Sequence, residues 1–138
     1  DKPHIHTTTA LCRNSASRDG VASSAIWAIV CGTSISAPAV TVWPTVVSIS
    51  AKGWIIADAG LKAFGMDHGN PSWDEGDVFF CSDEHITLLP RELGNWKVGD
   101  RVRIWPSHVD PTVARHENFW IVDGDNIRDR WPIDLRHW

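Results

Sequence analysis

The residues of this sequence best suited to chemistry are His108 and Asp110, two positions apart in the segment WPSHVDPT at 105–112. An imidazole nitrogen and a carboxylate oxygen are common ligands of divalent metal ions. In extended backbone, residues with this spacing project to the same side, about 6.6 Å apart along the chain. Two protein ligands would leave positions open to water or substrate, as in catalytic sites. The alternative is a turn in which Asp110 caps backbone amides and His108 is a surface residue.

Five further residues form a second group of candidates. Asp58, Lys62 and Asp67 are also explained by a turn and a salt bridge at a domain or subunit boundary. Glu84 and His85 stand at the start of an expected strand, where a buried, hydrogen-bonded His85 is favoured over a metal ligand. The sequence offers no convincing catalytic residue.

Three other side chains bear on the candidate site. His116 and Glu117 could orient the metal ligands from behind. His68 precedes a glycine and is expected to be exposed at a turn.

The elements that must position these residues are short strands. Strands are expected at 40–49, 54–57, 77–80, 85–89 and 101–105, followed by a hairpin of 119–122 and 127–131 around the turn DGDN. Pro44 indicates an edge or a bulge within the first of these segments. Residues 21–31 fit a short buried helix or a strand equally. The pattern predicts an all-β fold, a small barrel or sandwich, with an irregular or partly helical N-terminal lead-in.

Composition narrows the class of protein. The chain has 138 residues, a net charge of −4 and no apolar run long enough for a membrane span, so we expect one domain that binds neither nucleic acid nor membrane. Cys12, Cys31 and Cys81 form no CxxC pair, which favours a reducing, cytoplasmic location. Because the chain begins DKP without Met, we expect it to be processed or part of something longer.

Several motifs resemble one family of enzymes. The segment VGDRVRIWPSHVDPTV at 98–113 resembles the closing signature of the D-threonine aldolase and D-serine dehydratase-like family. The segments TVVS at 45–48, IADAGLKAF at 56–64, DHG at 67–69, SDEH at 82–85 and DRWP at 129–132 follow the same family's order. The resemblance covers roughly residues 39–133.

The resemblance implies a two-domain architecture. Such enzymes have an N-terminal (β/α)8 barrel that carries pyridoxal phosphate (PLP) on a lysine. Their C-terminal β domain supplies a His-x-Cys or His-x-Asp pair to a divalent metal beside the cofactor. Residues 38–138 then correspond to this β domain, and residues 1–37 match the family poorly, either as a barrel remnant or as an unrelated lead-in. The PLP lysine is absent, because no lysine of the chain lies in a matching motif (Lys2, Lys52, Lys62, Lys97).

The resemblance also implies a chemistry. Asp110 stands where the dehydratases have cysteine, and a carboxylate favours Mn²⁺ or Mg²⁺ and leaves Zn²⁺ open. The activity implied is retro-aldol cleavage of D-β-hydroxy-α-amino acids to glycine and an aldehyde. A D-serine dehydratase-like lyase domain is the alternative, and a non-catalytic, freestanding β-barrel binding module is another. We expect this chain alone to be without PLP and inactive. The sequence leaves open whether the chain forms a homodimer.

Overall fold

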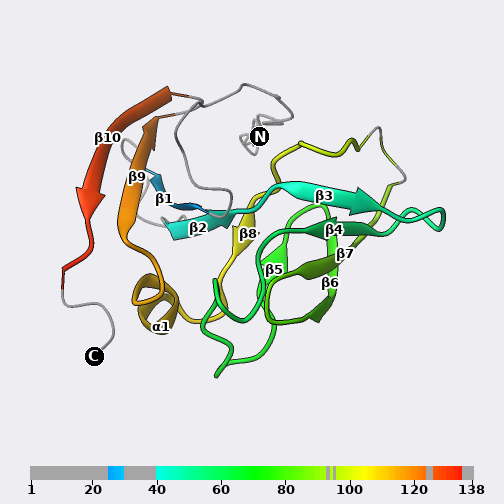
Figure 1. The fold of residues 1–138 in the computed structure, drawn as a ribbon, viewed down its shortest axis with the longest axis horizontal. Coiled ribbons are helices and arrows are strands. Elements are labelled where there is room, and N and C mark those ends of the chain that lie inside the picture. The colour runs from blue at the N-terminus through cyan, green and yellow to red at the C-terminus, as the bar shows by residue number, and fades with distance from the viewer. Residues whose placement is uncertain (1–24, 30–39, 93, 95, 124–125, 135–138) are drawn as a thin grey trace, which may run out of the picture.

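The elements of the described residues are strands apart from one short helix, which confirms the predicted fold class. The computed structural model describes residues 25–29, 40–92, 94, 96–123 and 126–134. Figure 1 shows the elements, which are β1 (Ala25–Ile29), β2 (Val40–Trp43), β3 (Val46–Ile49), β4 (Ile55–Ala57), β5 (Ser72–Trp73), β6 (Gly76–Cys81), β7 (Ile86–Pro90), β8 (Ile104–Trp105), α1 (Val109–Val113), β9 (Asn118–Asp123) and β10 (Asn126–Pro132). Among these described elements, no helix has the length and apolarity needed to cross a bilayer.

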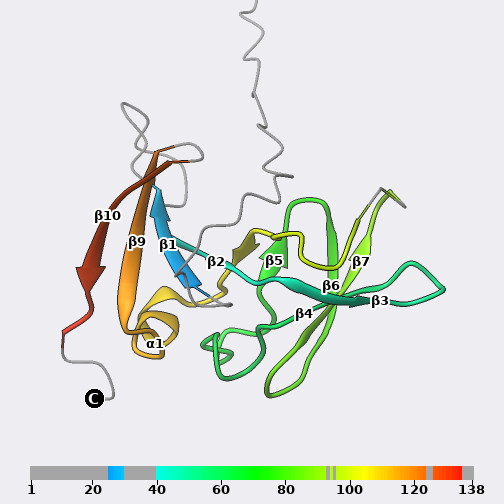
Figure 2. The same cartoon turned by 45° about the horizontal axis from the view of Figure 1, so that its top comes forward.

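The strands form one curled sheet in the order β10-β9-β1-β2-β8-β5-β6-β7-β4-β3. The longer strand pairings lie toward the two ends of the sheet. Between them, β8 connects β2 and β5 through short pairings, such as that of Val42 with Ile104. Figure 2 shows β10, β9, β1 and β2 on one side of the molecule and β3 to β7 on the other. The short α1 lies below β9, at the edge between these two groups.

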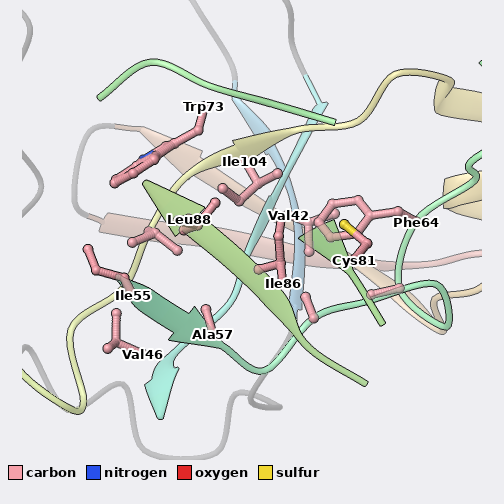
Figure 3. Packing of buried hydrophobic residues seen from close by; sticks show 13 residues of the cluster. Val42, Val46, Ile55, Ala57, Phe64, Trp73, Cys81, Ile86, Leu88 and Ile104 are labelled. Carbon is pink, nitrogen blue, oxygen red and sulfur yellow. The ribbon is translucent and has the colours of Figure 1, made fainter. Parts of the chain in front are cut away.

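The core lies against β4, β6 and β7, and burial alternates along β4 and β7. Ile86 and Leu88 of β7 are fully buried, while Thr87 between them is half-buried. Ile55 pairs with Leu88, and Ala57 pairs with Ile86, so the same faces of neighbouring strands stack inward. Figure 3 shows these side chains converging with others from β2, β5 and β8. The period-two pattern therefore determines which face of the sheet is buried.

Two predicted strand segments are modified by local chemistry. The segment 40–49 divides at Pro44 into β2 and β3. The proline indicated an edge or a bulge, and β3 is an edge strand of the sheet. The segment 101–105 forms regular pairing only at Ile104–Trp105, although its alternation persists, since Val102 and Ile104 are buried. The amide of Val102 bonds to the carbonyl of Pro44 instead of to a strand ladder.

The region before the predicted domain boundary contributes one described strand. β1 lies between β2, to which it is antiparallel, and β9, to which it is parallel. Of the two alternatives for residues 21–31, the strand is correct over 25–29, and the remaining residues of 1–37 lie outside the described ranges. The boundary between residues 37 and 38 stays a prediction.

The predicted C-terminal hairpin is confirmed. β9 and β10 pair antiparallel from Asn126 with Asp123 onward, with an irregularity between Ile127 and Asp129. The turn residues 124–125 lie outside the described residues.

Candidate metal centre

The candidate site lies where residues 63–69, the loop after β4, meet residues 107–116, which include α1. We call this set of contacts the clasp. Gly65 forms an isolated antiparallel bridge with His108, and the Ser107 hydroxyl donates to the carbonyl of Gly69 at 2.8 Å. A Cβ on Gly65 would lie 2.3 Å from Cγ of Pro111, so the two segments approach closely only because this position is glycine.

Two buried polar side chains hold the clasp from inside. The Thr112 hydroxyl accepts from the amide of Gly65 at 2.9 Å. The His116 ring Nε2 lies 2.9 Å from the carbonyl of Ala63, and because a carbonyl only accepts, this nitrogen carries a proton and donates. Burial lowers the pKa of His116 below its ordinary value, because the charged ring would lose its hydration.

His108 is oriented by Asp67. Its Nδ1 lies 2.5 Å from the Asp67 carboxylate, and this hydrogen bond holds the pKa of Asp67 below its ordinary value. The bond places the ring proton of neutral His108 on Nδ1, which leaves the Nε2 lone pair available. Among the described residues, Nε2 of His108 has no hydrogen-bond partner. The half-buried ring thus offers one free nitrogen in the arrangement typical of metal-ligating histidines.

His68 stacks on the face of His108. The ring centroids are 4.1 Å apart and the planes differ by 2°. Donor atoms of Asp67, His68 and His108 all lie within 4.8 Å of one another. The lone pairs of parallel rings lie in parallel planes, however, and do not converge on one point. His68 is exposed, as predicted, and its ring lies over the His108 ring.

Asp110 is exposed in the first turn of α1. The expectation of extended backbone through this residue is wrong, since His108 is extended (φ −139°, ψ 121°) but the helix begins at Val109. Pro111 is tolerated there because the first turn of a helix has no use for its missing amide proton. The same-side argument from strand geometry therefore no longer supports the pairing of His108 with Asp110, which stays a prediction.

A family profile covers the whole clasp. The profile described as "Putative serine dehydratase domain" matches residues 39–122. The chain belongs to this family.

Relatives of this serine dehydratase-domain chain include much longer enzymes. It is 37% identical over 84 residues to the 3-hydroxy-D-aspartate aldolase of Paracoccus denitrificans, covering 59% of this chain and 21% of that protein. It is 32% identical over 96 residues to the D-threonine aldolase of an Arthrobacter species, covering 67% and 25%. The chain thus spans a quarter or less of the length of these curated aldolases.

One relative is of a different kind. An uncharacterized protein of Mycobacterium tuberculosis (strain ATCC 25618 / H37Rv) is 31% identical over 113 residues, and the match covers 71% of this chain and 84% of that protein. A match that covers most of both chains shows that this domain also makes up most of one relative.

Solved structures agree with the family. The D-threonine aldolase from Filomicrobium marinum has a TM-score of 0.63 at 33% identity, over 68% of this chain and 27% of that one. The D-threo-3-hydroxyaspartate dehydratase from Delftia sp. HT23 has a TM-score of 0.61 at 23% identity, over 72% and 33%, which supports the fold alone.

The other candidate residues of this serine dehydratase-domain chain take part in contacts that stabilise turns or pair charges on the surface. The Asp58 carboxylate accepts from the amide of Thr45 at 2.6 Å, which ties the turn after β4 to the residue before β3. Lys62 and Glu84 form an exposed ion pair, as the salt-bridge alternative expected. The prediction of a buried His85 is wrong: it is exposed in the turn between β6 and β7, where its amide bonds to the Ser82 hydroxyl.

One of the two residues predicted to orient the metal ligands contacts the loop that carries Asp67. His116 is buried and holds Ala63, four residues before Asp67, whereas Glu117 is exposed and its carbonyl accepts from Ile133. Thr112 was not singled out by the sequence. Its only signal was its position two residues after Asp110, inside the segment that resembles the family signature.

Proposed function

We propose that this domain binds one divalent metal ion through Nε2 of His108 and the carboxylate of Asp110. The observation that supports the proposal best is the Nδ1 contact of His108 with Asp67, which leaves one nitrogen free and oriented. Asp110 is exposed at the start of the helix that follows His108, so its carboxylate is accessible to an ion. A nitrogen and a hard oxygen donor favour Mn²⁺ or Mg²⁺, with Zn²⁺ also compatible.

In this proposal the domain serves a PLP-dependent lyase of the D-threonine aldolase type. The metal ion would polarise the β-hydroxyl of a D-β-hydroxy-α-amino acid, while PLP, held by another part of the enzyme, would stabilise the carbanion left by Cα–Cβ cleavage. The residues of this chain orient the ligand: Asp67 holds the Nδ1 proton of His108, and His68 covers the ring face. The products would be glycine and an aldehyde, and a dehydratase would expel the hydroxyl instead.

Titration with Mn²⁺, followed by electron paramagnetic resonance, tests the metal site. Wild type should bind one ion weakly, because two protein ligands leave the other positions to water. His108→Ala should abolish this binding and Asp110→Asn should weaken it strongly, while both variants stay folded. His85→Ala, which removes an exposed histidine elsewhere, is the matched control. Equal Mn²⁺ binding by wild type and His108→Ala would refute the proposal.

The identity of the second ligand sharpens the test. Asp110→Cys should shift the preference from Mn²⁺ toward Zn²⁺, because a thiolate is the softer donor. Competition between the two ions in calorimetric titrations measures this shift. An unchanged preference would remove Asp110 from the ligand set while leaving His108 in it.

A second candidate function is a freestanding binding module without catalysis. The match that covers 84% of a mycobacterial protein favours it, because that relative consists largely of this domain. On this alternative the chain forms no Schiff base with PLP. Borohydride trapping followed by peptide mapping checks this, and a stoichiometric pyridoxyl adduct on one lysine would exclude it. Cytoplasmic location and a homodimer stay predictions of the sequence.

A further inference from the structure

Thr112 connects the two segments of the clasp through a single buried hydroxyl. The side chain is fully buried, and Oγ1 accepts from the amide of Gly65 at 2.9 Å. The same Oγ1 donates to the carbonyl of His108 at 2.6 Å. A hydroxyl can accept and donate at the same time, so both contacts exist together. Residues 47 positions apart in sequence are thereby joined through one atom.

The two backbone groups that Thr112 bonds belong to the segments whose side chains form the hydrogen bond between Asp67 and His108. Gly65 precedes Asp67 by two residues, and the carbonyl that accepts from Thr112 belongs to His108 itself. Thr112 bonds four residues back along the chain, as threonines in helices do, so the start of α1 places the hydroxyl. Without the hydroxyl the Gly65 amide would lose this acceptor, and burial keeps water from taking its place.

The other two side chains of the clasp bond only the loop that carries Asp67. Ser107 contacts carbonyls of Gly65 and Gly69, and His116 contacts that of Ala63. Thr112 alone among these three side chains bonds both the loop that carries Asp67 and the backbone of His108.

We propose that Thr112 is a positioning residue that sets the separation of Asp67 and His108 and so determines which nitrogen of His108 stays free. Its consequence for metal binding rests on the function proposed above. Its consequence for the His108 ring does not, because the Asp67 contact exists without an ion. The two parts can therefore be measured separately.

The test compares Thr112→Val, which keeps the shape and removes the hydroxyl, with Thr112→Ser, which keeps the hydroxyl. Nitrogen-15 NMR of the metal-free chain, at a pH where His108 is neutral, reports which ring nitrogen carries the proton. Wild type and Thr112→Ser should show the proton on Nδ1, and Thr112→Val should show both tautomers. Mn²⁺ affinity should fall about tenfold in Thr112→Val, the lower end of the range for residues that orient a ligand.

The chain supplies a matched control in Thr41. It is also fully buried, and its hydroxyl accepts from Trp43 Nε1 at 2.8 Å, in β2 and outside the clasp. Thr41→Val therefore loses a buried hydroxyl too, and should leave both the tautomer of His108 and the Mn²⁺ affinity unchanged. A purely structural role for Thr112 predicts that the two valine variants behave alike.

The outcomes separate the two proposals. A shifted tautomer in Thr112→Val, in a chain whose wild type binds no Mn²⁺, supports the positioning role and refutes the metal site. An unchanged tautomer and affinity overturn the positioning role. Should Thr112→Val fail to fold, Thr112→Ala removes the same hydroxyl and is compared with Thr112→Ser in its place.

Discussion

The core between β4, β6 and β7 and the clasp around His108 are built from different kinds of contact. In the core, Ile55, Ile86 and Leu88 are fully buried and touch neighbours on adjacent strands (Figure 3). In the clasp, two irregular segments are joined by hydrogen bonds of Thr112 and His116 to backbone groups. Apolar packing is non-directional, whereas these polar contacts depend on distance and angle.

The two regions therefore control different properties: the core determines the stability of the fold, and the clasp determines the geometry of the site. Loss of an apolar side chain from the core weakens the whole fold in proportion to the buried volume. Loss of one hydroxyl from the clasp removes less free energy but releases a specific alignment, that of Asp67 with His108. We therefore expect core substitutions to change stability without changing the site, and clasp substitutions to change the site at a smaller cost in stability.

The largest effect is expected in the core. Leu88→Ala should lower the free energy of unfolding by about 2–5 kcal/mol, because the fully buried side chain leaves a cavity. Urea denaturation measures this, with Leu61→Ala at an exposed position as the control. The remaining folded molecules should keep the Nδ1 proton on His108. A change in the His108 tautomer of folded Leu88→Ala would show that the core and the clasp are not independent.

A smaller effect is expected where the two segments of the clasp approach. Gly65→Ala should cost about 1–3 kcal/mol, the usual range for overpacking, because its Cβ would overlap the ring of Pro111. It should also disturb the His108 tautomer, which the core variant does not. Adding Pro111→Ala should recover part of the loss, since it removes the Cγ that the new methyl meets. Strictly additive costs would show that this contact is not the cause.

The pH dependence of stability follows from His116. Because its folded-state pKa is lowered by burial, the unfolded chain binds a proton below about pH 6.5 that the folded chain does not. Its contribution to stability is therefore fully present above that pH and is lost as the pH falls toward the folded pKa, by at most about 1.4 kcal/mol per pH unit. His116→Gln should remove this part of the slope in urea titrations at several pH values. His85→Gln, at an exposed histidine, should keep it.

The smallest effect is expected at the surface pair outside both regions. Lys62 and Glu84 are exposed by 69% and 58%, and the pair raises the pKa of Lys62 through its hydrogen bond to Glu84. Water and salt screen such a pair. Lys62→Ala should therefore leave the thermal midpoint and Mn²⁺ binding within error of wild type. A clear loss of binding would return Lys62 to the candidate site.

Much of the fold could be predicted because it depends on local patterns. The segment 85–89 was predicted as a strand and forms β7, and Pro44 indicated an irregularity in 40–49, where β2 and β3 separate. Two elements escaped for physical reasons. β5 has two residues, too few to show a period, and α1 has five residues and contains Pro111, which argues against a helix unless it lies in the first turn.

The candidate site was predictable only in part. His108 and Asp67 were both candidates, but Asp67 was placed in the second group, since a turn and a salt bridge also explained it, and 41 positions separate the two residues. Their contact depends on how the loop after β4 folds back onto the start of α1. The burial expected for His85 failed for a related reason: a strand-start position does not reveal whether the turn before it faces the core or water.

The sequence by itself determined the all-β class, the buried face of the strands and the family motifs, because side-chain period and residue type are properties of neighbouring positions. The tertiary structure alone decided that Asp67, and not Asp110, meets Nδ1 of His108, and that Thr112 joins the two segments. Hydrogen bonds across the clasp need their atoms within about 3 Å. Only the curled sheet and the close approach of Gly65 to Pro111 bring such distant positions to that distance.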